Sequence, residues 1–449
     1  MNNYFICLIA LFTIIGCQEN SNNKEINTQQ LRSESLKKIL SPNPCSIALI
    51  PHVGSDRSDL EIIRRQKQVE TDHNSVAYLE RLGWSYVNKA RISFDPGFYH
   101  LAEQTASCID SKLEKSSESL LLRGHVLHNL HRFKQAERIA IELIDQRGLW
   151  FDYGLLGDVL MDQGKLDEAV EAYQTMMNLR PGPQAFSRAA HVRWLKGDLS
   201  GAIEMMCMST RSNDPRTPES AAWSSVRLAL YRLQEENYIK AAALFSVSLE
   251  LVPDYAPALL GQGRLLLSQG EVQKAIVSLT KATRLNPLPE YQWILIDSLR
   301  LAGNKEQAIA IEATLLQHGE KEDPRTFALY LATTDQNPDT AVRLAKKELA
   351  VRTDVFTLDT VAWALNSAGH HREAQEYMKK ALSEGTQDAR LYYHAGVIAH
   401  ANGDIQKAQH WFNKIIPFRH MLLPSERDEF DREIVALNHI SQLSSLSWM

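Results

Sequence analysis

Gly164-Lys165-Leu166-Asp167-Glu168-Ala169 is one form of a short phrase that recurs along this chain. The phrase ends in an alanine, and equivalent alanines follow one another at intervals of 33 or 34 residues, with a single longer step of 39. These alanines are Ala102, Ala136, Ala169, Ala202, Ala241, Ala275, Ala308, Ala341, Ala374 and Ala408. A single globular core imposes no such interval, whereas a period near 34 is typical of helical hairpins stacked into a solenoid.

Each interval contains two helix patterns with a break between them. In residues 156–160 and again in 169–176, apolar residues recur at the spacing of an amphipathic helix. Gly164 stands between the two stripes, where a left-handed glycine can end the first helix. Pro181 follows the second stripe and cannot continue a helix. The sequence therefore predicts a helical hairpin in each repeat.

These phrases resemble the tetratricopeptide repeat, as the order Leu156-Gly157, Gly164, Ala169, Tyr173 and Pro181 shows. The resemblance covers about residues 75–420, and it is specific because ten units agree in spacing. It implies an all-α fold, a right-handed superhelical solenoid of about ten hairpins. Residues 421–449 are expected to form a capping helix and tail. The family further implies a concave groove that binds proteins or peptides.

The N-terminus has the pattern of a signal peptide. Residues 4–15 are uninterruptedly apolar, which is too short for a membrane span of about 20 residues and suits the core of a secretory signal. The following Gly16-Cys17 completes a segment, 1–17, that resembles a bacterial lipoprotein signal with Cys17 as the lipid attachment site. A plain secretory signal and an ordinary buried segment are the alternatives. Residues 18–30 are polar and predict a flexible tether, and 31–74 predict a loop-rich lead-in with one or two short helices.

Composition and motifs argue against several functions. The net charge of −5 does not favour nucleic acid, which needs a basic face. His125, His128 and His131 lack a nearby carboxylate or thiolate to complete a metal site, so surface histidines are expected there. No catalytic or nucleotide-binding motif occurs, and nothing outside the repeats is large enough for a catalytic domain. We therefore expect no enzyme, no cofactor and no metal.

Three cysteines remain beyond the signal segment: Cys45, Cys108 and Cys207. An odd number leaves at least one unpaired in an oxidising compartment. A bond between Cys45 and Cys108 stays open, although isolated helical cysteines are more often small buried hydrophobes.

The predicted groove can be read from one face of the first helix of each hairpin. Positions 18, 15, 11 and 8 before the repeat alanine share a face that, in this repeat family, lines the concave surface. Aromatic and arginine residues, which dominate binding hot spots, are frequent there. The expected groove residues are His125, His128, Asp158, His191, Trp194, Arg264, Trp293, Asp297, Arg300, Tyr330, Asp359, Trp363, Asn366, Arg390 and Tyr393. Trp223 shares this face, and for Trp223 and Trp363 a packing role between repeats is equally expected.

Two functions follow from this pattern. The first is a lipid-anchored scaffold that binds a protein or peptide partner in its groove, in the assembly or secretion machinery of a bacterial envelope. The second is an envelope carbohydrate-binding lipoprotein that uses the groove aromatics as sugar platforms. The row Trp293, Asp297 and Arg300 is predicted to bind a partner, so that alanine at 293 and 300 weakens capture without lowering the melting temperature. The expected location is the outer membrane, on its periplasmic or surface side.

Overall fold

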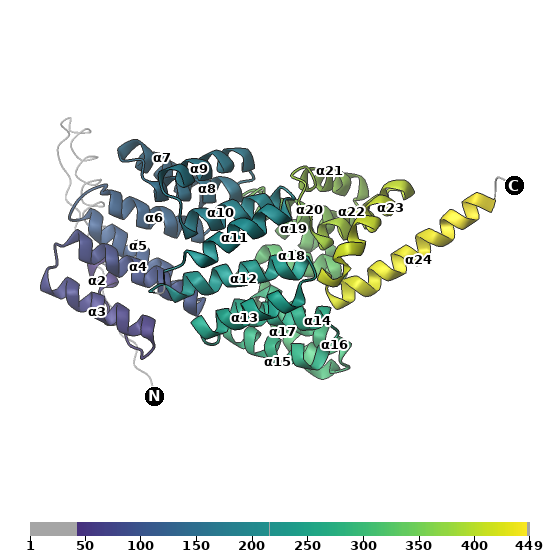
Figure 1. The fold of residues 1–449 in the computed structure, drawn as a ribbon, viewed down its shortest axis with the longest axis horizontal. Helices are drawn as coiled ribbons and strands as arrows, with labels where there is room; N and C mark the ends of the chain where they lie inside the picture. The colour runs from purple at the N-terminus through teal and green to yellow at the C-terminus, as the bar shows by residue number, and fades with distance from the viewer. Residues whose placement is uncertain (1–42, 215, 447–449) are drawn as a thin grey trace, which may run out of the picture.

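The computed structural model describes residues 43–214 and 216–446, with side chains as far as 437. The predicted signal segment with Cys17, the tether and the start of the lead-in lie outside these residues. Every regular element in the described ranges is a helix, as the sequence predicted, and the chain runs as a continuous array of antiparallel helices (Figure 1). None of these helices is both long and apolar enough to cross a membrane.

Within residues 43–214 and 216–446, ten helical hairpins make up the body. Their first helices are α4 (Val76–Ser93), α6 (Ser117–Asn129), α8 (Trp150–Asp162), α10 (Pro183–Leu195), α12 (Pro218–Gln234), α14 (Ala256–Ser268), α16 (Pro289–Leu301), α18 (Pro324–Thr333), α20 (Val355–Ser367) and α22 (Ala389–Ala401). Their second helices are α5 (Gly97–Asp110), α7 (Phe133–Gln146), α9 (Leu166–Leu179), α11 (Leu199–Arg211), α13 (Tyr238–Leu251), α15 (Val272–Leu285), α17 (Lys305–Glu322), α19 (Pro338–Leu349), α21 (His371–Ala381) and α23 (Ile405–Ile415). Each helix packs against the next along the chain, which gives the predicted solenoid.

The repeated small residues set the spacing of the hairpins. All ten repeat alanines lie on second helices and are at most 1% exposed. Opposite them, a Cβ added to Gly157 would come within 2.3 Å of the Tyr173 ring, and one added to Gly396 within 2.1 Å of Phe412. These distances are too short for any side chain. The small residues are therefore required by the close approach of the paired helices.

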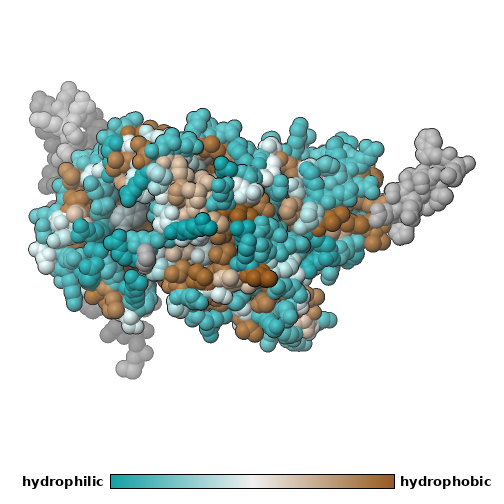
Figure 2. Space-filling model, in the orientation of Figure 1, coloured by the Kyte–Doolittle hydropathy of each residue, from teal (hydrophilic) through white to brown (hydrophobic). Residues whose placement is uncertain are grey.

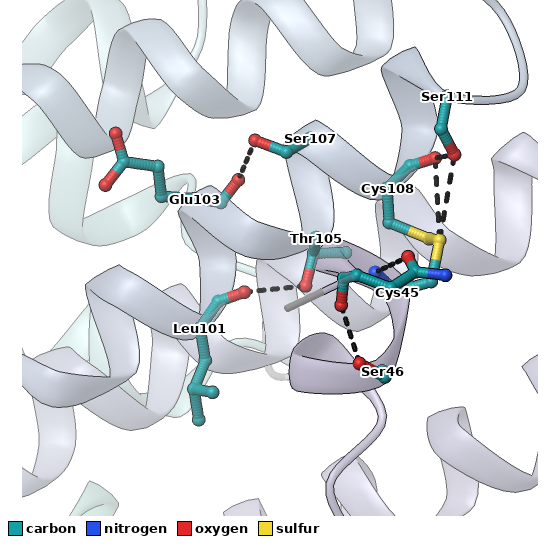
Figure 3. The surroundings of a disulfide bond; sticks show 9 residues. Cys45, Ser46, Leu101, Glu103, Thr105, Ser107, Cys108 and Ser111 are labelled. Atoms are coloured by element: carbon teal, nitrogen blue, oxygen red, sulfur yellow. Dashed lines mark hydrogen bonds between the residues drawn. A yellow bond between two sulfur atoms is a disulfide. The ribbon is translucent and has the colours of Figure 1, made fainter. Parts of the chain in front are cut away.

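The lead-in is more ordered than the sequence indicated. It contains α2 (Pro44–Ala48) and the fifteen-residue α3 (Arg57–Thr71), whose first turn is fixed by a capping box between Asp56 and Asp59. A disulfide joins Cys45 of α2 to Cys108 of α5, with the two Cα atoms 4.7 Å apart (Figure 3). Of the two alternatives that the sequence left open, the structure has the bond, because the fold brings α2 onto α5; Cys207 has a free thiol.

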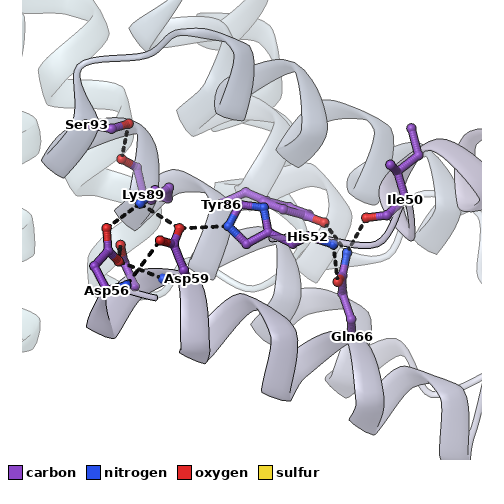
Figure 4. Close-up of polar contacts among 9 residues, drawn as sticks. Ile50, His52, Asp56, Asp59, Gln66, Tyr86, Lys89 and Ser93 are labelled. Carbon is purple, nitrogen blue, oxygen red and sulfur yellow. Dashed lines mark hydrogen bonds and ion pairs between the residues drawn. The ribbon is translucent and has the colours of Figure 1, made fainter. Parts of the chain in front are cut away.

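A polar network holds the lead-in against the first hairpin (Figure 4). The ammonium group of Lys89 lies 2.6 Å from Asp56 and 2.7 Å from Asp59, and Asp59 also bonds to His52 at 2.8 Å. Burial opposes ionisation of Asp59, yet hydrogen bonds from Lys89 and His52 hold its pKa below the usual range. Since α4 supplies Lys89 and the other partners belong to the lead-in, this network is structural.

The solenoid closes on itself. The C-terminal ends of the first helices α8, α10 and α12 meet loops that lie 153 to 191 residues later in the chain. Thr386 donates to the carbonyl of Leu195 at 2.5 Å, and Gln234 donates to the carbonyl of Gln387 at 2.6 Å. Lys196 pairs with Glu384 at 3.2 Å. The array therefore forms a closed turn with an interior, and its concave surface is not an open trough.

The C-terminal segment covers one side of this interior. A 3₁₀ turn, η1 (Ile416–Met421), leads into α24 (Pro424–Leu446), the predicted terminal helix. His420 bonds to the carbonyl of Leu233 at 2.9 Å, which places η1 against the end of α12. Phe430 packs edge-to-face on Phe412 of α23. Farther along, α24 leaves the body, as Figure 1 shows.

Candidate functional site

A cavity of about 490 Å³ lies inside the closed turn, and we call it the central chamber. Its walls come from the first helices α10, α12, α14, α16, α18 and α20, together with the start of α22 and with η1. Six of the predicted groove residues line it: His191, Trp194, Arg264, Trp293, Asp359 and Arg390. The volume falls in the range of sites for small ligands or short chain segments, about 300–1,000 Å³.

Aromatic rings form one wall of the central chamber. Trp194 stacks on His191 at 5.7 Å between centroids, on Phe356 at 5.9 Å and on Tyr231 at 6.1 Å. The indole of Trp194 donates to Gln234 at 2.8 Å, so its orientation is fixed. Trp223 also faces the chamber and stays 39% exposed. On the face drawn in Figure 2, hydrophobic residues form patches among hydrophilic ones.

The Arg227 guanidinium lies against this wall. It sits 5.5 Å from the Tyr231 ring centroid and 6.0 Å from that of Trp194. One terminal nitrogen bonds to Nδ1 of His191 at 3.1 Å. Burial, reinforced by the Arg227 charge, lowers the pKa of His191 to about 3, so this imidazole is neutral near pH 7. Arg227 is therefore held by a neutral partner.

Outside the chamber, polar groups on first helices pair with the next first helix. His128 bonds to Asp162 at 2.8 Å, and Asp158 bonds to Arg188 at 2.7 Å. Burial opposes ionisation of Asp158, yet the Arg188 charge and hydrogen bonds hold its pKa below the usual range. His125 bonds to Arg91 at 2.9 Å. These predicted groove residues therefore form contacts between neighbouring repeats.

Asp359 and Arg264 follow the same rule although they line the chamber, whereas Arg390 pairs with the terminal helix. Asp359 bonds to the buried His394 at 2.8 Å. Arg264 pairs with Glu290 at 3.2 Å. Arg390 pairs with Glu426 of α24 at 2.5 Å.

The predicted row Trp293, Asp297 and Arg300 is not free for a ligand. Trp293 is 1% exposed and packs edge-to-face on Tyr330 at 5.6 Å, with Arg390 covering its ring at 4.7 Å. Asp297 accepts a hydrogen bond from Ser425 of α24 at 2.5 Å. Arg300 pairs with Glu312 of its own hairpin. The expectation of an exposed aromatic plate with two free charges is wrong. Neighbouring elements bury Trp293 and Asp297, and the exposed Arg300 is paired with Glu312.

The remaining predicted residues lie outside the chamber lining. Trp363 stacks on His394 at 4.0 Å, and its indole donates to Thr333 at 3.0 Å. Tyr393 is buried beside Trp363, and Asn366 bonds to His371 at 2.9 Å. For Trp363 the structure supports the packing alternative.

Comparison with known proteins accounts for this architecture. A family model described as tetratricopeptide repeat matches residues 226–287, 260–324 and 362–419, and a second model with the same description matches 153–183. Residues 153–183, 226–324 and 362–419 therefore match tetratricopeptide repeats. A TPR repeat-containing protein of Pseudomonas aeruginosa is 29% identical over 197 residues, which are 42% of this chain and 33% of that protein. The match thus spans about a third of that relative's length.

The fold also has a likeness among solved structures. A structure described as a human IFIT1 dimer with PPP-AAAA shares 13% identity with this chain at a TM-score of 0.47. The alignment covers 88% of this chain and 95% of that one.

The sequence did not predict the chamber residues that lie next to the predicted groove positions. Arg227 lies fourteen positions before Ala241, between two of the positions that define the concave face of each tetratricopeptide repeat. Tyr231 likewise lies one position away from a predicted groove position. Arg227 could have been identified by including the helix positions next to the predicted face. The signal is a basic residue that has no acidic residue at the corresponding place in the next repeat.

Asp297 makes the stability of the tetratricopeptide array dependent on pH. Burial raises its pKa from 3.8 to about 6, although hydrogen bonds from Ser425 act in the opposite direction. Below pH 3.8 the carboxyl is protonated in both the folded and unfolded states. Above pH 6 the folded state carries a buried charge that the unfolded state solvates, so stability is lost as the pH rises through this window.

Asp297→Asn is therefore expected to raise the free energy of unfolding at pH 8 by about 1–3 kcal/mol and to change it little at pH 4. Urea unfolding at the two pH values measures the difference, with the exposed Asp339→Asn as control. An equal effect of Asp297→Asn at both pH values would contradict the raised pKa.

Proposed function

We propose that this protein is a lipid-anchored interaction scaffold that holds a protein or peptide partner in its central chamber, in assembly or secretion at a bacterial envelope. The observation that carries the proposal is the chamber itself, where exposed Trp223 and the ring wall meet polar groups at the centre of a repeat array. Tetratricopeptide repeats favour a scaffold over an enzyme, and concave apolar sites with a few placed polar groups are typical binding sites.

Two features support the envelope location. The segment ending at Cys17 resembles a lipoprotein signal, and dual acylation of such a cysteine gives stable membrane attachment. The Cys45–Cys108 disulfide fits an oxidising compartment, since such bonds are rare in a reducing cytosol.

The groove aromatics favour a peptide over a sugar. Sugar platforms need flat rings that face solvent, whereas two of the four groove tryptophans, Trp293 and Trp363, are buried. Charged residues alternate with these rings along the same helices. This arrangement suits the mixed contacts of a polypeptide.

The proposal can be tested by photo-crosslinking in cells. A benzophenone amino acid replaces Trp223 in the chamber in one strain and Ile239, which is 86% exposed on α13, in the other. We expect one discrete adduct from position 223 and none from 239, in the membrane fraction of cells with native Cys17. Cys17→Ser is expected to release the protein into the soluble fraction.

Two results would contradict the proposal. Equal adducts from both positions would mean that the chamber is no preferred contact site. A protein that stays soluble with Cys17 intact would remove the anchor.

A further inference from the structure

We propose that the central chamber is a receptor site for a carboxylate joined to a flat apolar group, with the carboxylate bound by Arg227 and the flat group against Trp194 and Phe356. This inference rests on the proposed role of the chamber as the binding site. It adds to that role the chemical class of the ligand.

Arg227 has hydrogen-bonding capacity to spare. Within residues 43–214 and 216–437, no carboxylate forms an ion pair with its guanidinium group. One terminal nitrogen contacts the neutral His191 at 3.1 Å and the Tyr231 hydroxyl at 3.5 Å. The Nε atom is buried without a hydrogen-bond partner, which is unfavourable because it has lost its contacts with water and gained none in return. A ligand oxygen that bound this edge of the guanidinium group would satisfy Nε.

Charge balance favours a single negative charge on the ligand. The other three arginines of the lining are already paired: Arg264 with Glu290 at 3.2 Å, Arg325 with Asp354 at 3.4 Å, and Arg390 with Glu426 at 2.5 Å. Among the arginines of the described lining, Arg227 is the one without an ion-pair partner. The lining carboxylates Asp359 and Asp388 are held by His394 and by the backbone N–H of Leu391. A planar guanidinium group matches the two oxygens of a carboxylate. A phosphate dianion would carry one negative charge more than Arg227 can neutralise.

The wall beside Arg227 favours a flat apolar group next to the carboxylate. Trp194 and Phe356 lie nearly parallel, with an angle of 20° between their planes. The hydrogen bond from Trp194 to Gln234, which itself bonds to Gln387 across the closure, fixes this surface before a ligand arrives. Preorganised rings give apolar contact at little entropic cost.

Such a ligand has two sources, the C-terminal end of a peptide that finishes in an aromatic residue and a free aromatic acid. Titration calorimetry on the full chain distinguishes them with four probes: N-acetylphenylalanine, its amide, a hexapeptide ending in phenylalanine with a free carboxylate, and the same peptide amidated. Both acids are expected to bind at least tenfold more tightly than their amides. A tighter peptide acid identifies a chain end as the source, and equal affinities identify the free acid.

Arg227→Gln is expected to weaken binding of both acids at least tenfold, about 1.4 kcal/mol, and to leave the amides unchanged. Arg227→Lys keeps the charge and should keep the preference for acid over amide. The control is Arg232→Gln on the same helix, because Arg232 pairs with Glu235 outside the chamber. Circular dichroism confirms that each variant is folded.

The inference is overturned if acid and amide bind equally to the wild-type chain, or if Arg227→Gln binds the acids as well as Arg232→Gln does. That result leaves the scaffold standing provided that the crosslink from position 223 persists. Loss of that crosslink with intact binding of the acids would instead overturn the scaffold and leave the carboxylate site.

Discussion

Trp293→Ala is expected to lower the free energy of unfolding by about 3–5 kcal/mol, the cost of removing a large aromatic side chain from a packed core. Trp293 is 1% exposed at the middle of α16, between Tyr330 and Arg390. Its deletion leaves a cavity at the junction of three repeats, which rigid helices cannot fill. Urea unfolding followed by far-ultraviolet circular dichroism measures the effect without relying on the tryptophan that is lost.

Trp223→Ala is the matched control, because it removes the same atoms from a residue that is 39% exposed. We expect this variant to lose less than about 1.5 kcal/mol. If Trp293→Ala cost no more than Trp223→Ala, the indole of Trp293 would not be a core side chain.

Loss of the disulfide is the second large effect. Cys45 and Cys108 are 63 residues apart, so their bond restricts the unfolded chain over a long loop. Replacing both by serine is expected to cost about 2–4 kcal/mol in the stability of the N-terminal hairpins. Limited proteolysis should then cleave first near α2 and α3, and thiol alkylation of the unreduced wild type should label Cys207 and neither Cys45 nor Cys108.

Cys207→Ser provides the control, since Cys207 has a free thiol. Reducing agent should destabilise this variant as it does the wild type and should leave the double-serine variant unchanged. Alkylation of all three cysteines before reduction would show that the bond does not form.

The repeats could be predicted from the sequence because the packing requirement that produces them recurs at a fixed interval. Each hairpin needs a small residue at its crossing, so the packing requirement reappears as alanine at one interval. The contacts that close the solenoid leave no periodic pattern in the sequence. It depends on single contacts, such as Thr386 with the carbonyl of Leu195, that occur once and join loops remote in the chain.

The sequence identified part of the chamber lining but not the contacts that its residues make, for a similar reason. Residues of the concave face were identified from their position on the first helices, and six of them line the chamber. The position does not tell whether a charge is satisfied by the next repeat, as Asp158 is by Arg188. It also does not show that α24 returns to cover Asp297. Both facts depend on the geometry between repeats.

The central claim is that a partner occupies the chamber, and competition for the crosslink at position 223 tests it most directly. The yield of the adduct is measured while the aromatic hexapeptide acid or its amide is added to membranes before illumination. The account predicts that the acid reduces the yield in proportion to its occupancy of the chamber and that the amide does not. An unchanged yield at saturating acid would contradict it, because the partner and the acid would then bind at different places.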